Sequence, residues 1–146
     1  MAGSKSNFLE TRVVNTVIGK STTLVAPSTM WIALLTITGT DAWIPTDTGE
    51  VPKATTNYVR FKFTNSTASN WTKATVGSLQ NKAVFTFTPA TGAGGTWGTV
   101  KSMAIVDSSS TASGNNWYWG DLTANQTISV GNTVRFTTGS IVITED

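Results

Sequence analysis

The spacing of apolar residues changes along the chain, from a helical period before Pro27 to a strand period after it. Residues 30–37, MWIALLTI, form a short, continuous apolar run, which predicts a buried central strand. Further short strands, separated by turn-forming residues, are predicted at residues 57–64, 83–88, 99–107, 117–122, 126–130, 133–137 and 140–144. About eight strands at this spacing predict an all-β fold, a single β-sandwich of jelly-roll or Greek-key type, with an up-and-down barrel as the alternative.

One helix is predicted before the strands, over residues 7–18. Asn7 followed by Glu10 has the spacing of a capping box, and Gly19 supplies the stop. The apolar stripe of this helix consists of Leu9, Val13 and Val17, widened by Val14 and Ile18 and with Phe8 at one end. Because a helix of about 12 residues is marginal alone in water, we expect this stripe to pack either on the β-domain or against a neighbouring subunit.

Residues 57–64, NYVRFKFT, alternate between polar and apolar positions. The pattern predicts a strand with one face in water, carrying Tyr58, Arg60, Lys62 and Thr64. The other face would turn Val59, Phe61 and Phe63 toward the core.

Residues 116–122, NWYWGDL, concentrate aromatic side chains in one predicted strand. Strict alternation would place Trp117, Trp119 and Asp121 on one face and Tyr118 on the other. Large apolar area on both faces favours an aromatic strand in the core or at an interface, and an open aromatic platform for a sugar or a base is the alternative.

The composition is that of one domain. A chain of 146 residues with 39% hydrophobic residues can bury one core, divided here into an N-terminal arm and helix, residues 1–20, and a β-sandwich, residues 28–146. Charged residues make up only 12%, about half the usual share. The 28 Thr and 14 Ser residues supply a surface rich in hydroxyl groups, and Thr favours strands.

Little catalytic chemistry is available to this sequence. With no His and no Cys, it lacks the commonest general base, the thiol nucleophile and the usual zinc ligands. Asp107 and Asp121 lie near strand ends, where a glycosidase pair would lie, but acids at such junctions are more often turn formers. The loop acids Asp41, Asp47 and Glu50 fit no calcium-binding spacing. We therefore expect no enzyme, no bound metal and no cofactor.

Nucleic acid and membrane are not expected partners. The net charge is +2, and the ten Lys and Arg residues are scattered along the chain. No apolar run approaches the roughly 18 residues that span a bilayer, and the first residues, MAGSKSN, lack the apolar stretch of a secretion signal. We expect a chain without a membrane anchor.

Several segments, in this order, resemble one group of proteins. They are MAGSKSNFLETRVVNTVIG, MWIALLT, TGEV followed by NYVRF, WGTV leading into AIVD, and NNWYWGDLTANQTISVGNTVRFTTGSIVI. Together they are similar to small bacteriophage virion proteins that are labelled capsid decoration (cement) protein, tail protein or tail fibre protein. The resemblance covers most of the chain, and the first segment and the last 30 residues are its most specific parts.

The resemblance implies a β-sandwich that is displayed in many copies on a virion, is made in the cytoplasm of a bacterial host and carries no catalytic residues. Its implied partners are the major capsid protein or other virion subunits, including further copies of the chain in a homo-oligomer. Our first hypothesis is a capsid decoration protein that bridges coat subunits through several contacts at once. The alternative is a tail or fibre component with an exposed aromatic site for a glycan or receptor. Candidate partner contacts are Phe8, Leu9, Val13 and Val17 on the helix and, as exposed anchors in loops, Trp43 and Trp71.

Overall fold

The fold is that of a computed structural model, which describes residues 2–19, 23–46, 48–88, 90–91 and 95–145. Helix α1 (Asn7–Val14) continues into a π-helical turn, Asn15–Gly19, and Lys53–Thr55 form a 3-10 turn. The strands are β1 (Ala2–Lys5), β2 (Thr29–Leu35), β3 (Phe61–Thr64), β4 (Ser78–Gln80), β5 (Phe85–Thr86), β6 (Gly98–Val106), β7 (Asn116–Ile128), β8 (Arg135–Phe136) and β9 (Val142–Thr144). The prediction of an all-β fold with one N-terminal helix is confirmed.

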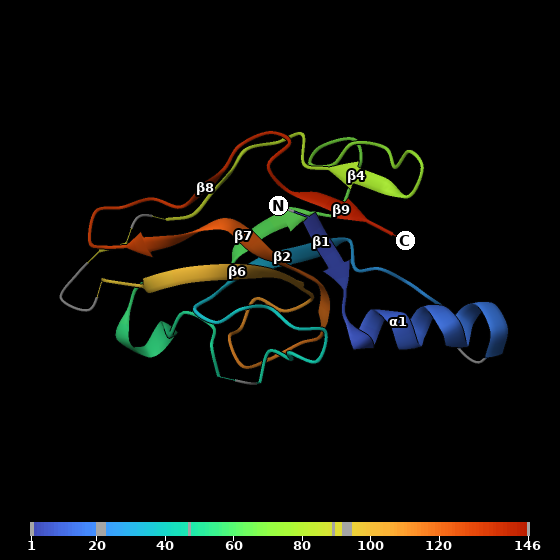
Figure 1. The fold of residues 1–146 in the computed structure, drawn as a ribbon, viewed down its shortest axis with the longest axis horizontal. Coiled ribbons are helices and arrows are strands. Elements are labelled where there is room, and N and C mark those ends of the chain that lie inside the picture. Colours follow the sequence, from blue (N-terminus) through green and yellow to red (C-terminus); the bar gives the residue numbers. More distant parts are fainter. Residues whose placement is uncertain (1, 20–22, 47, 89, 92–94, 146) are drawn as a thin grey trace.

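Two sheets of unequal size make up the domain (Figure 1). The larger sheet has the strand order β3-β2-β6-β7-β1-β9-β4, and β5 pairs with β8 in the smaller one. Neighbouring strands are antiparallel except for β1 and β9, which are parallel. This arrangement is consistent with a β-sandwich, whereas a jelly-roll topology is not confirmed.

The main core lies between the two sheets and is rich in aromatic rings. Phe63 of β3 stacks on Phe85 of β5, with ring centroids 5.7 Å apart, and Phe61 lies 5.2 Å from the same ring. Phe87 in turn contacts Phe136 of β8. Because the contacts of Phe61 and Phe63 with Phe85 join strands of different sheets, the burial of aromatic area holds the sandwich together.

A second, smaller core covers the opposite face of β2 and β6. Ala33 of β2 pairs with Ala104 of β6, and these small side chains leave room for Trp43. The segment that carries Trp43 returns to the sheet through hydrogen bonds between Thr36 and Gly49 and between Val51 and Leu34. The central strand β2 is therefore buried on both faces, as its apolar sequence predicts.

Strand β1 lies inside the larger sheet. Ser4 of β1 pairs with Trp119 of β7, and Gly3 pairs with Ile143 of β9. Within the single domain that was expected, β1 thus adds part of the N-terminal arm, residues 1–20, to the sheet of the β-sandwich, residues 28–146. Without β1, strands β9 and β4 would lose their connection to β7.

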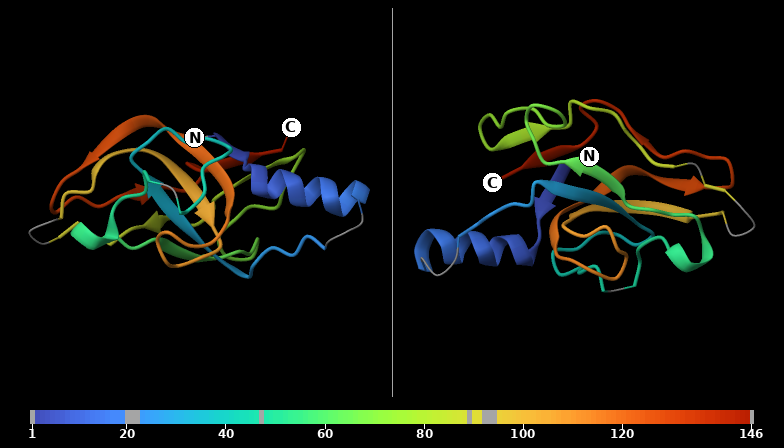
Figure 2. Two further views of the ribbon diagram at one scale, coloured as in Figure 1. Left: turned by 90° about the horizontal axis from the view of Figure 1, so that it is seen from below. Right: turned by 180° about the vertical axis from the view of Figure 1, so that it is seen from behind.

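Helix α1 leaves the domain at one end of the sheet (Figure 2). Its N-cap is Ser6 and not Asn7: the Ser6 hydroxyl accepts a hydrogen bond from the backbone N–H of Leu9 and donates one to the carbonyl oxygen of Asn116. The helix begins at Asn7, as predicted, and only the predicted capping residue is wrong, by one position. The Asn116 contact ties the first turn to β7, and the later turns project away from the sheets.

Candidate interaction surface

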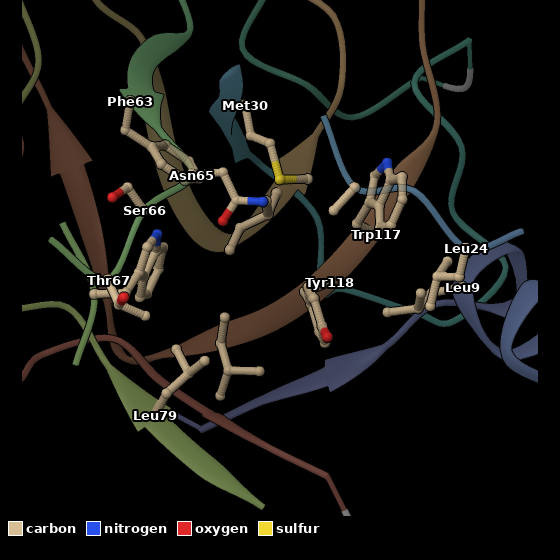
Figure 3. A pocket seen from close by; sticks show the side chains of 14 residues that line it. Leu9, Leu24, Met30, Phe63, Asn65, Ser66, Thr67, Leu79, Trp117 and Tyr118 are labelled. Carbon is tan, nitrogen blue, oxygen red and sulfur yellow. The ribbon is translucent and has the colours of Figure 1, made fainter. Parts of the chain in front are cut away.

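An open, apolar groove of about 340 Å³ lies beside the first turns of α1 (Figure 3). Its walls come from segments far apart in the sequence, and they include Leu9, Leu24, Met30, Trp71, Leu79 and Trp117. None of the residues that line it carries a charge. We call this cavity the apolar groove.

A β-bulge in β7 turns two consecutive aromatic residues toward the apolar groove. Asn116 pairs with Val106 and Tyr118 pairs with Ile105, so Trp117 is an extra residue between two ladder positions. Strict alternation is therefore wrong at Trp117, which is buried in the main core and makes an edge contact with Phe8 at 5.4 Å. Trp117 thus lies in the main core, and Tyr118 is half-buried against the same core.

Trp119 lies on the other side of β7, against the loop that follows β2. Its indole N–H donates a hydrogen bond to Asp41 at 2.7 Å, and a Cβ at Gly39 would run into its ring. Asp121 lies on the same side and accepts a hydrogen bond from the backbone N–H of Gly39. The predicted shared face of Trp119 and Asp121 is therefore confirmed, although Trp119 is only half-buried.

Tyr118 links the apolar groove to a polar rim. Its hydroxyl donates a hydrogen bond to Glu145 at 2.9 Å, and Glu145 forms an ion pair with Lys5 at 2.7 Å. Burial is the main cause that raises the pKa of the Tyr118 hydroxyl above its usual range, followed by the hydrogen bond to Glu145 and its charge. The hydroxyl therefore stays protonated and serves as a donor.

The far part of the helix is exposed. Val14, Val17 and Ile18 are 59%, 65% and 78% exposed, and we call these three residues the helix end. The four helix residues predicted as partner contacts fall into two groups: Leu9 is in the core and Phe8 and Val13 pack against it, whereas Val17 is open to solvent. The stripe therefore docks on its own domain near its start and is left without cover near its end.

Two predicted anchors are buried. Trp43 is 3% exposed and belongs to the second core, and Trp71 is 4% exposed and makes edge contacts with Phe63 and Phe85. The prediction that both are exposed is wrong, because loops that cross a sheet face supply core residues. Trp71 reaches the surface only as part of the wall of the apolar groove.

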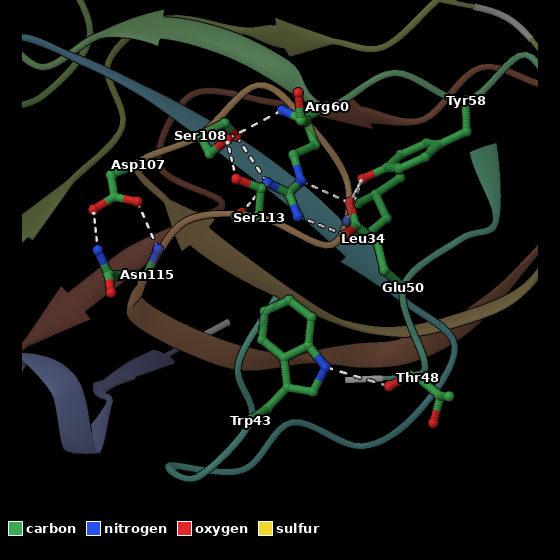
Figure 4. Close-up of polar contacts among 11 residues, drawn as sticks. Leu34, Trp43, Thr48, Glu50, Tyr58, Arg60, Asp107, Ser108, Ser113 and Asn115 are labelled. Atoms are coloured by element: carbon green, nitrogen blue, oxygen red, sulfur yellow. Dashed lines mark hydrogen bonds and ion pairs between the residues drawn. The ribbon is translucent and has the colours of Figure 1, made fainter. Parts of the chain in front are cut away.

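A charged pair is buried near the C-terminal end of β2 (Figure 4). Glu50 and Arg60 form a bidentate pair at 2.7 and 2.8 Å, with side chains 6% and 0% exposed. The remaining guanidinium nitrogen of Arg60 donates to the carbonyl oxygens of Ser108 and Ser113. The pair thus joins the loop after β2 to the loop between β6 and β7.

Tyr58 completes this cluster. Its hydroxyl accepts a hydrogen bond from the backbone N–H of Leu34 at 2.8 Å and donates one to Glu50 at 3.1 Å. Burial, followed by the nearby charge of Glu50, raises the pKa of the Tyr58 hydroxyl. We call Glu50, Tyr58 and Arg60 the buried clamp.

The buried clamp corrects the prediction for residues 57–64. Strand β3 begins only at Phe61, and the predicted wet-face residues Tyr58 and Arg60 are buried, whereas Val59 is exposed. From Phe61 onward the predicted alternation holds, with Phe63 buried and Lys62 exposed. Periodicity cannot anticipate a buried arginine, since its partner Glu50 lies in a loop with no repeating pattern.

Those carboxylates considered for catalysis or calcium that the structure describes take part in local structure. Asp107 accepts hydrogen bonds from Asn115 and from the indole N–H of Trp117, and Asp121 binds Gly39. Asp47 lies outside the described residues. Among the residues that the structure describes, no three His, Cys, Asp or Glu side chains lie together as a metal site would need.

In the described part of the chain, no helix is long and apolar enough to span a membrane.

The fold and its surface define a class: a small all-β structural domain with an apolar groove and a projecting helix. A family model described as podophage GP4 fiber I protein gp80 matches residues 4–144, which include both sheets and the helix. The chain belongs to this family and is therefore a structural protein of the bacteriophage virion. A comparison with individually curated proteins gives no match.

Proposed function

We propose that this chain is a subunit of a phage fibre, held in the virion by contacts with other subunits and without catalytic activity of its own. The family match over residues 4–144 carries this proposal. It favours the fibre alternative over capsid decoration, which was our first hypothesis. The geometry supports a structural role, because the carboxylates considered for catalysis bind neighbouring loop groups and the helix end is open for contact.

Glycan binding through the predicted tryptophans is not part of the proposal. Trp43 and Trp71 are buried and cannot stack on a sugar ring. Trp119 is half-buried, and its indole N–H is bonded to Asp41. Receptor binding by the assembled fibre would need another surface.

Labelling of purified virions tests the position of the chain in the virion. Gold-conjugated antibodies against the chain should mark fibres in electron micrographs, and quantitative mass spectrometry should find far fewer copies than of the major capsid protein. Label spread evenly over the head, with a copy number close to that of the capsid protein, would contradict the fibre assignment and support capsid decoration.

A further inference from the structure

The helix end presents apolar area that its own domain leaves uncovered. Val14, Val17 and Ile18 are each more than half exposed, and Val25, in the segment that returns toward β2, is 68% exposed. Residues 13–19 contain no charged side chain. A cluster of exposed aliphatic side chains at the tip of a projecting element is typical of an interaction site and not of a solvated surface.

The apolar groove presents the complementary surface on the same chain. It opens beside α1, with Leu9 and Leu24 on the helix side and Thr67 and Leu79 on the far side (Figure 3). Its volume of about 340 Å³ exceeds that of a single aliphatic side chain. Since neither surface is charged, no electrostatic cost opposes their contact, and a charged partner would gain nothing from either.

The size of the two surfaces decides the kind of occupant. A stable interface buries about 800 Å² on each partner, and three or four aliphatic side chains alone supply less than this. If each copy both inserts its helix end and receives that of another copy, every subunit buries both surfaces. Such reciprocity arises only when the occupant is a second copy of this chain in a closed oligomer.

We infer that the helix end of one copy fills the apolar groove of another, so that copies of this chain form a closed oligomer. Ile18 and Val17 enter the groove between Trp71 and Leu79, and the polar rim formed by Tyr118, Glu145 and Lys5 stays at its border. This contact is one interaction of the proposed fibre subunit. It rests on the proposed function only for the place of the oligomer in the virion. It is tested on the purified chain, independently of where the chain lies in the virion.

Sedimentation velocity over a range of concentrations measures the contact. The native chain should form an oligomer of fixed size, and Ile18→Asp should weaken association at least about tenfold, because a carboxylate would have to be buried in an uncharged groove. The matched control is Val130→Asp, which places the same charge on an exposed valine in the turn after β7, away from the helix. It should associate as the native chain does.

Variants of the apolar groove test the other side of the contact. Leu79→Asp, with its fold checked by circular dichroism, should weaken association as Ile18→Asp does. A mixture of the two variants should associate more strongly than either alone, because one intact helix end can then meet one intact groove. A native chain that stays monomeric, or an unaffected Ile18→Asp or Leu79→Asp variant, would overturn the inference. Fibre labelling in virions would still stand in that case.

Discussion

The buried clamp and the apolar groove both lie beside β2, yet their side chains have opposite environments. At the clamp, near Leu34, charged and polar atoms are removed from water and each is matched by a hydrogen bond. At the groove, near Met30, apolar side chains line a space that the chain itself does not fill. One region completes the fold, and the other leaves a surface open.

The difference shows which interactions tolerate change. A buried ion pair is stabilising only while both partners and their hydrogen bonds are present, because an isolated charge in the interior is costly. An apolar wall depends on area and shape, so single changes in it have graded effects. We therefore expect a single substitution in the clamp to cause a large loss of stability. Single substitutions in the wall of the groove should cause graded effects that follow the apolar area removed.

The largest effect is expected from breaking the clamp. Glu50→Ala should lower the free energy of unfolding by about 3–5 kcal/mol, since it leaves the Arg60 guanidinium buried without its counter-ion. Denaturant unfolding followed by tryptophan fluorescence measures this loss. The control is Lys62→Ala, a nearby exposed charge in β3, which should change stability by less than about 0.5 kcal/mol.

A double variant separates charge from packing at the clamp. Glu50→Met combined with Arg60→Met removes both charges and should be more stable than Glu50→Ala alone, because no unpaired charge remains buried. A double variant less stable than the single one would show that the hydrogen bonds to Ser108 and Ser113 matter more than the charge balance.

An effect of similar size is expected in the aromatic strand beside the apolar groove. Trp117→Ala should cost about 3–5 kcal/mol, because its ring belongs to the main core and contacts Phe8. Trp119→Ala should cost less, on the order of 1 kcal/mol, because its ring is only partly buried. Thermal unfolding of the two variants gives the comparison. Equal losses would mean that the bulge at Trp117 does not distinguish the two faces of β7.

The smallest effect is expected in alkaline solution, where the two regions can be compared through their tyrosines. Both Tyr58 and Tyr118 have a raised pKa in the folded state, so the unfolded chain loses these protons first. Stability should thus be constant below about pH 10 and fall above it, by up to about 1.4 kcal/mol per pH unit for the buried Tyr58. The half-buried Tyr118 should contribute less.

Single phenylalanine variants test the tyrosine comparison. Tyr58→Phe should flatten the fall in stability above pH 10 more than Tyr118→Phe does, as measured by denaturant unfolding across that range. At neutral pH, Tyr58→Phe should also cost about 1–3 kcal/mol, because the backbone N–H of Leu34 loses its acceptor. If Tyr118→Phe flattened the curve more, the groove and not the clamp would contain the more deeply buried hydroxyl.

Apolar periodicity predicts the central strands well. Strand β2 and strand β6 lie within two residues of their predicted ends, because their apolar runs are buried on both faces. Strand β1 was missed: Ala2–Lys5 has no apolar alternation, and its strand conformation depends on hydrogen bonds to β7 and β9. Strand β4 was missed for a similar reason, since it is a short edge strand in a polar segment.

The candidate surface was only partly predictable. The helical stripe named Val17 as a candidate contact, and Val17 is exposed in the structure, but the pattern cannot show where along the helix contact with the domain stops. The burial of Trp43 depends on two alanines in neighbouring strands, Ala33 and Ala104, and their pairing is not visible before the register is known. The apolar groove combines residues from the helix, several strands and a loop, so no single segment indicates it.

The position of β1 also bears on how the domain folds. Ser4 finds its partner at Trp119 and Gly3 finds its partner at Ile143, so the first strand cannot pair until most of the chain has been synthesised. Contacts of such long sequence separation carry a high loop-closure entropy and slow folding. Since Ser6 caps α1 directly after β1, and its hydroxyl binds Asn116, the helix is anchored in the same late step. The projecting helix is therefore fixed in place only when the sheet has closed. An ordered helix end is thus available for contact only after the subunit has folded.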